Sequence, residues 1–164
     1  MRADRQMMFI GITGHRGLPA HSAQLIDTAL RAALAEYGDR VTGVSALADG
    51  ADQLFARAVL DQGGQIEVIV PAARYRDGLP AESHAEYDDL IGHAIKVHRL
   101  DFTESTPEAH LAASELMISM VSELLAVWDH QPARGHGGTA DVVTHARDCG
   151  RRVRVIWPEG AARD

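Results

Sequence analysis

The sequence predicts an α/β fold: a Rossmann-like three-layer sandwich with a mostly parallel sheet. Short apolar runs alternate with longer segments of helical periodicity along nearly the whole chain. Glycine-bearing loops follow three of the predicted strands, which is typical of parallel sheets that bind ligands at one edge. The chain has 164 residues and contains no internal repeat or linker, so residues 1–164 are expected to form a single domain.

Three strands and two helices are predicted in the first half of the chain. The strands are the apolar runs 7–12, 41–46 and 66–70, the last ending at Pro71. The first helix spans 22–37, since its apolar residues recur at helical spacing and Gly38 supplies a stop signal. The second spans 50–62 and is closed by two glycines.

The second half continues the alternation. Helices are predicted at 81–94, at 107–121, where Pro107 suits the first turn, and at 139–149. Strands are predicted at 95–100, 124–128 and 153–157. Right-handed crossovers would place the loops that follow the strands on one edge of the sheet.

Composition excludes several classes of protein. The formal net charge of −7 argues against a general nucleic-acid-binding surface, and no apolar run is long enough to span a membrane. Cys149 is the only cysteine, so no internal disulfide can form and a cytoplasmic location is expected. The histidines at 84, 93, 98 and 110 form no compact ligand set, so neither a metal nor a cofactor is expected.

The most informative segment follows the apolar run 124–128 and precedes a helical pattern. It contains Arg134, Gly135, His136, Gly137, Gly138 and Thr139. A strand, a glycine-rich loop and a helix present backbone N–H groups to an anion at the positive end of the helix. The arginine favours phosphate, because a guanidinium matches phosphate oxygens. A glycine-rich surface turn with no ligand is the alternative.

Two further loops should reach the same edge. Gly14, His15 and Arg16 follow the first strand and could approach a phosphate or a sugar, or could form a tight turn with solvated side chains. Gly50 and Asp52 begin the second helix, where Asp49 could cap the helix. Asp52 either matches the helix dipole or binds the hydroxyls of a ribose.

Other polar residues flank the predicted pocket. The loop 74–77 holds two arginines and a tyrosine, which could stack on a base or clamp a phosphate, or could simply be solvated. Thr139 is expected to cap the last helix or to bind the anion through its hydroxyl. Asp141 lies in the first turn of that helix, where a carboxylate could orient a sugar, serve as a base, or only match the helix dipole.

At these three loops the chain resembles the SLOG superfamily, the Rossmann-like group that includes the LOG proteins and relatives of DprA and YpsA. The likeness rests on residues 10–16, 48–52, 127–129 and 134–139 and covers nearly the whole chain. The resemblance implies a nucleotide or nucleotide-derived ligand whose phosphate sits on the glycine-rich loop. Proteins of this group commonly assemble into oligomers.

The chain departs from the LOG phosphoribohydrolases, which carry Pro-Gly-Gly-x-Gly-Thr-x-x-Glu. Here the proline is Arg134, the second glycine is His136 and the catalytic glutamate is Val142. The arginine that those enzymes use has no counterpart between residues 110 and 120. Asp141 lies one residue early, which turns a helical side chain by about 100°.

Binding or sensing of a nucleotide-type small molecule is therefore the first hypothesis. The alternative is an N-glycosidase-type hydrolase in which Asp141, with His136 or Asp129, supplies the acid–base chemistry. A third interpretation is an assembly domain with a vestigial pocket. A homodimer or higher homo-oligomer is expected, because the helix 107–121 has more apolar residues than one face requires.

Overall fold

Six parallel strands form the central sheet of the computed structural model, which describes residues 6–132 and 138–162. The sheet order is β4-β3-β2-β1-β5-β6, and every pairing is parallel, so the expectation of a mostly parallel sheet is met in full. The strands are β1 (Met8–Gly14), β2 (Val41–Ser45), β3 (Gln65–Ala72), β4 (Lys96–Phe102), β5 (Glu123–Val127) and β6 (Arg152–Ile156).

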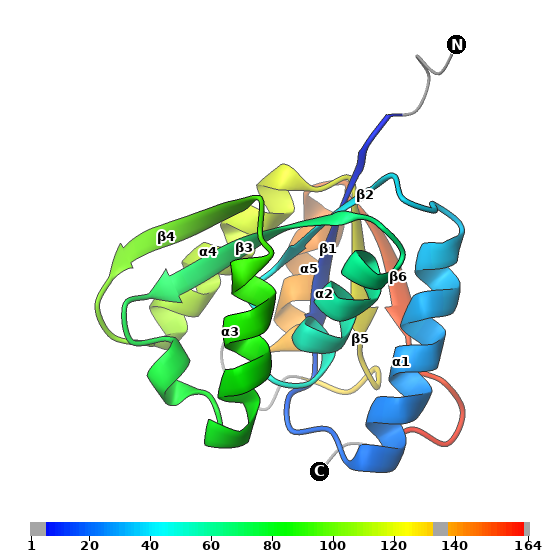
Figure 1. Ribbon diagram of the computed structural model, residues 1–164, viewed down its shortest axis with the longest axis horizontal. Helices are drawn as coiled ribbons and strands as arrows, with labels where there is room; N and C mark the ends of the chain where they lie inside the picture. The colour runs from blue at the N-terminus through cyan, green and yellow to red at the C-terminus, as the bar shows by residue number, and fades with distance from the viewer. Residues whose placement is uncertain (1–5, 133–137, 163–164) are drawn as a thin grey trace.

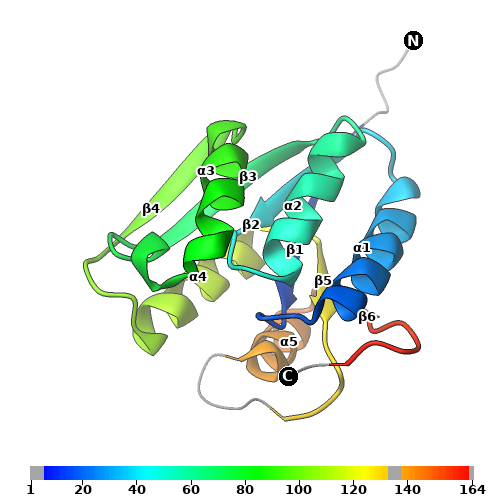
Figure 2. The same ribbon diagram turned by 60° about the horizontal axis from the view of Figure 1, so that its bottom comes forward.

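Helices cover both faces of this sheet, which confirms the three-layer sandwich (Figure 1). One face carries α1 (Ala20–Ala35), α2 (Ala51–Asp61) and α3 (His84–Gly92); the other carries α4 (Pro107–Met120) and α5 (Thr139–Asp148). Two short 3₁₀ turns, η1 (Arg76–Gly78) and η2 (Ala81–Ser83), lead from β3 into α3. Figure 2 brings forward the edge at which the strands end and at which α1, α2 and α5 begin.

Each face has its own hydrophobic core. Leu30 of α1 and Phe55 of α2 are fully buried against the first face, together with Ile10 of β1. Met117 of α4 packs with Leu124 of β5 on the other face. Strands β2 and β5 are buried along their whole length, as expected for inner strands covered on both sides. Burial of each large apolar side chain contributes about 1.5–3 kcal/mol.

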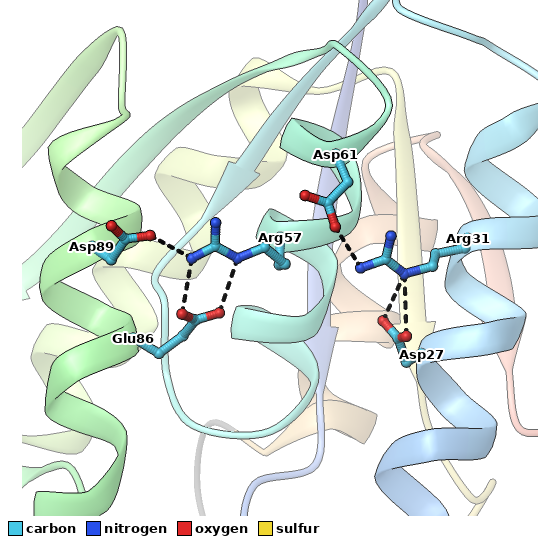
Figure 3. A network of polar contacts seen from close by, with 6 residues as sticks. All are labelled: Asp27, Arg31, Arg57, Asp61, Glu86 and Asp89. Atoms are coloured by element: carbon cyan, nitrogen blue, oxygen red, sulfur yellow. Dashed lines mark hydrogen bonds and ion pairs between the residues drawn. The ribbon is translucent and has the colours of Figure 1, made fainter.

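Ion pairs connect the three helices on the first face (Figure 3). Arg31 of α1 pairs with Asp61 of α2 at 2.8 Å, and Arg57 of α2 pairs with Glu86 of α3 at 2.8 Å. Asp27 and Asp89 complete the two clusters. These pairs are partly exposed, so each contributes only about 0.2–1 kcal/mol. They fix the relative positions of α1, α2 and α3 more than they determine stability.

One predicted boundary is wrong for a clear physical reason. Pro71 does not end the third strand, since β3 continues to Ala72. The pairing with β4 shifts register between Val70 and Ala72, and the pairing with β2 ends at Val68. The missing N–H of proline therefore removes no regular ladder bond. Pro107 does begin α4, and Thr106 caps it by accepting a hydrogen bond from the Ala109 backbone N–H at 3.2 Å.

Candidate functional site

The order of the strands reverses between β1 and β5, which is where open parallel sheets form a crevice at their carboxyl edge. A cavity of about 550 Å³ opens there. It is lined by residues from the ends of β1, β2 and β3, from the first turns of α2 and α5 and from one face of α4, among them Gly14, Asp52, Pro71, His110 and Thr139. The structure thus places a ligand-sized cavity at the edge indicated by the three loops.

Six of the residues predicted for the site line this cavity. They are Gly14, His15, Arg16, Asp52, Gly138 and Thr139. Gly50 is not one of the lining residues, while Arg134, Gly135, His136 and Gly137 lie outside the described residues. Asp141 is exposed on α5 and is not part of the lining, although it does lie in the first turn as expected.

Two glycines allow the loops to pack closely around the cavity. A Cβ at Gly14 would lie 2.5 Å from the Cβ of Ala51 and 2.8 Å from that of Val127. Gly50 has a φ of +88°, and a Cβ there would lie 2.6 Å from the His15 carbonyl oxygen. The loop after β1, the start of α2 and the end of β5 therefore touch at backbone distance, and only glycine fits these two positions.

Asp49 holds the loop after β1 instead of capping α2. Its carboxylate accepts a hydrogen bond from Arg16 Nε at 2.8 Å and one from the Gly17 backbone N–H at 2.9 Å. The N-cap of α2 is Gly50, which offers no side chain, so the expected capping role of Asp49 is wrong. The guanidinium of Arg16 is thereby oriented at the rim of the cavity, with the side chain 47% exposed.

His15 joins three segments that are distant in sequence. Its Nε2 accepts a hydrogen bond from the Asp129 backbone N–H at 3.2 Å and lies 3.3 Å from the Asp129 carboxylate. Its ring meets Trp157, just after β6, edge-on at 5.5 Å. The side chain is only 9% exposed, so His15 positions the loops more than it offers a free group to a ligand.

Asp52 presents a carboxyl group to the cavity from the first turn of α2, as expected. Its Oδ2 accepts a hydrogen bond from the Ala48 backbone N–H at 3.3 Å. Burial raises the pKa of Asp52 to about 7, because water is largely replaced by protein around the carboxyl group. The Ala48 N–H and the positive charge of Arg16 oppose this rise in pKa, and the negative charge of Asp49 adds to it.

The first turn of α5 closes the cavity on the β5 side. Gly138 is the N-cap and Thr139 is the first helical residue, with no side-chain hydrogen bond to the cap, so the predicted capping role of Thr139 is wrong. Gly138, Thr139 and Ala140 all line the cavity. The first amide groups of a helix have no partner within it and carry the positive end of its dipole, so this wall can attract an anion.

Residues of α4 form a wall of the cavity that the sequence analysis did not assign to the site. His110, Ala113, Ser114 and Met117 line it at the spacing i, i+3, i+4, i+7, which marks one face of a helix and was the available signal. His110 Nε2 lies 2.7 Å from Ser105 Oγ, and burial lowers the pKa of His110. The wall combines two polar side chains, His110 and Ser114, with two apolar ones, Ala113 and Met117.

The loop after β3 contributes its aromatic residue but not its two arginines. Tyr75 lines the cavity, is 5% exposed and meets the ring of His110 edge-on at 5.8 Å. Arg76 pairs with Asp88 of α3, and Arg74 lies 3.5 Å from Glu104. Two binding roles were predicted for this loop, stacking on a base and clamping a phosphate. Only stacking on a base is compatible with the residues that line the cavity.

Within the described ranges 6–132 and 138–162, no group of three or more histidine, cysteine, aspartate or glutamate side chains is arranged to hold a metal ion. No helix in the described part of the chain is both long and apolar enough to cross a membrane.

Comparison with known proteins gives matches in structure only. No family model matches the chain, and no curated protein sequence matches it. DNA processing protein A (DprA) from Streptococcus pneumoniae superposes with a TM-score of 0.68 at 16% identity over 94% of this chain. The chain spans only 52% of that protein.

Two other structures have the same arrangement. DprA from Helicobacter pylori matches with a TM-score of 0.64 at 18% identity, over 96% of this chain and 69% of its own. The molybdenum cofactor binding protein from Rippkaea orientalis matches with a TM-score of 0.60 at 12% identity, over 94% of this chain and 78% of its own. These matches, at 12–18% identity, show that the chain shares the fold of these proteins, which is the fold expected from its resemblance to the SLOG superfamily.

Proposed function

We propose that the chain binds a nucleotide or nucleotide-derived small molecule in the cavity at the carboxyl edge of its sheet. The observation that carries the proposal is the convergence of the loop after β1, the start of α2 and the start of α5 on a single cavity of about 550 Å³. Small-molecule sites have volumes of roughly 300–1,000 Å³ and combine apolar walls with a few polar groups. This cavity has both features.

The groups around the cavity suit the two ends of a nucleotide. The first turn of α5 offers Gly138 and Thr139 to a phosphate, and Arg16 adds a positive charge at the rim. The sequence assigns the segment 134–137 to the same phosphate. Asp52 offers acceptor oxygens to the sugar or base.

The structural relatives support a ligand of this chemistry. The H. pylori DprA structure concerns single-stranded DNA binding, and the R. orientalis protein binds the molybdenum cofactor. The net charge of −7 favours a small molecule over a nucleic acid for this chain, because binding along a phosphate backbone relies on many cationic contacts.

A nucleotide panel tests the proposal. Nucleoside mono-, di- and triphosphates and dinucleotides are screened by thermal shift, and hits are measured by calorimetry. A ligand at a hundredfold its Kd stabilises the fold by about 2.7 kcal/mol. Gly138→Leu should abolish binding because it fills the N-terminus of α5, whereas Gly92→Ala, which meets open space at the end of α3, should not. A folded Gly138→Leu variant of unchanged affinity contradicts the proposal, as does a panel with no hit.

Hydrolysis of an N-glycosidic bond is the second candidate, and one observation favours it. A carboxyl group whose pKa lies near 7 suits general acid–base chemistry, and Asp52 has both that pKa and a place in the cavity. We nevertheless expect binding without turnover, since Val142 stands where the resemblance requires a glutamate. Release of free base from a nucleoside monophosphate, lost in Asp52→Asn, would establish the hydrolase.

A further inference from the structure

The cavity has two chemically different sides. Its anion-binding wall belongs to α5, which follows β5, whereas Tyr75 follows β3 on the other side of β1 and β2. Strands β5 and β3 are three strand spacings apart, or about 14 Å. A ligand whose phosphate lies at α5 can therefore place a sugar near β1 and a ring near β2 and β3.

The side next to β3 is lined by aromatic and apolar side chains. Tyr75 and His110 meet edge-on at 5.8 Å and form an aromatic corner of the lining. Ile69, Ala113 and Met117 provide an apolar surface next to them. Aromatic and apolar side chains of this kind bind heterocycles by stacking and contact, and they offer little to a sugar with its many hydroxyl groups.

A single carboxyl group accompanies this corner. Asp52 lines the same cavity as Tyr75 and His110, and after burial its charge is the next contribution to the raised pKa of the Tyr75 phenol. Apart from the Ala48 backbone N–H at 3.3 Å, the described residues give the Asp52 carboxyl group no hydrogen-bond donor. Its Oδ1 is available to a ligand, and Oδ2 has a second lone pair that can accept another hydrogen bond.

We infer that Asp52 reads the amino-bearing edge of a nucleobase: an exocyclic amino group beside a ring nitrogen, held next to Tyr75 and His110. A carboxyl group presents two oxygens in the plane and at the spacing of such an edge. The inference rests on the proposed function, and it narrows the ligand to nucleotides whose base carries such an edge, namely guanine, adenine or cytosine, and excludes hypoxanthine.

Guanine and adenine require different protonation states of the Asp52 carboxyl group. Guanine donates from both its amino group and its ring nitrogen, and so requires the ionised carboxylate. Adenine donates from its amino group and accepts at its ring nitrogen, and so requires the protonated acid. With the pKa of Asp52 at about 7, guanine binding should strengthen and adenine binding should weaken as the pH rises from 6.5 to 8.

Other titratable residues also face Asp52. Arg16 and Asp49 face it from the loops after β1 and β2 and pair with each other at 2.8 Å. Tyr75 and His110 face it from the loop after β3 and from α4. Burial raises the pKa of the Tyr75 phenol well above its ordinary value and lowers the pKa of His110, and both shifts favour the neutral forms.

The experiment compares GMP, AMP and IMP on the full chain by calorimetry. IMP is the matched ligand, since it keeps the sugar, the phosphate and a purine ring but lacks the amino group. We expect GMP or AMP to bind at least about tenfold more tightly than IMP at pH 7. Asp52→Ala should reduce the affinity for the preferred nucleotide to the affinity for IMP. Asp148→Asn changes an exposed residue at the end of α5 and should leave the affinities for all three nucleotides unchanged.

Two results overturn the inference and leave the proposed function intact. One is equal binding of GMP, AMP and IMP to the wild type. The other is a preference that survives in an Asp52→Ala variant whose thermal unfolding shows that it is folded. Failure of every nucleotide in the panel to bind instead refutes the proposed function, and this inference with it.

Discussion

The carboxyl group in the cavity should make the stability of the protein depend on pH in an unusual direction. The pKa of Asp52 rises from 3.8 to about 7 in the folded chain, so between pH 4 and 7 the folded state holds a proton that the unfolded state releases. Unfolding then releases a proton, and the free energy of unfolding falls as the pH rises through this window. Above pH 7 the folded chain carries a poorly solvated carboxylate.

The size of this effect follows from the shift in pKa. About three pKa units correspond to an upper limit of about 4 kcal/mol. Asp52 lines an open cavity and retains partial access to water, which reduces the expected value to about 2 kcal/mol. Asp52→Asn removes the ionisation and keeps an oxygen that can accept the hydrogen bond from the Ala48 N–H. The variant should therefore approach the stability of the wild type near pH 4 and exceed it by about 2 kcal/mol at pH 8.

Urea denaturation of both proteins at pH 4, 5, 6, 7 and 8 measures the difference directly, because the other titrating groups are common to both. Asp148→Asn serves as the control, since that carboxylate is exposed at the end of α5. The reasoning is refuted if the stability difference between Asp52→Asn and the wild type stays within about 0.5 kcal/mol across this range.

Four further predictions concern packing, buried polar groups and assembly. Gly14→Ala should lower the free energy of unfolding by about 2–3 kcal/mol, whereas Gly92→Ala, with nothing within 4 Å, should be neutral or slightly stabilising; equal effects would contradict the packing argument. Tyr37→Phe should cost about 2 kcal/mol by calorimetry, because the Tyr37 hydroxyl donates to buried Glu123 at 2.6 Å, and a neutral result would show that water replaces it. Arg57→Ala should cost about 1 kcal/mol in low salt and less in 1 M salt; a cost independent of salt would point to packing of its stem. Light scattering at micromolar concentration should give the mass of at least two chains, and a mass of one chain at all concentrations rules out the homo-oligomer.

Every helix and strand of the sheet could be predicted from the pattern of apolar residues, and the errors lie mainly at their ends. The fifth strand begins one residue earlier than predicted, at Glu123. A glutamate at a strand start suggests a loop, but this one is 2% exposed and accepts a hydrogen bond from Tyr37. A partner 86 residues away decides the boundary, and local pattern contains no information about it.

The candidate site could likewise be predicted only in part from the sequence. Gly14, Arg16 and Asp52 could be predicted to share a cavity, because parallel topology brings the loops after the strands to one edge. The capping role expected for Asp49 fails, since a short polar side chain before a helix can bind any nearby donor and here Arg16 and Gly17 supply it. The contribution of α4 to the cavity was not predicted, because the apolar residues of this helix fit a hydrophobic core or an oligomer contact equally well.

The close packing around Gly14 also restricts how this edge can evolve or be redesigned. Gly14, Ala51 and Val127 come from three segments and share one small volume, so none can grow unless another shrinks. Substitutions at these positions should be strongly non-additive: Gly14→Ala should be tolerated better when Val127 is also replaced by a smaller residue. A library that varies the three positions together should therefore yield folded pockets of altered shape that single substitutions cannot reach.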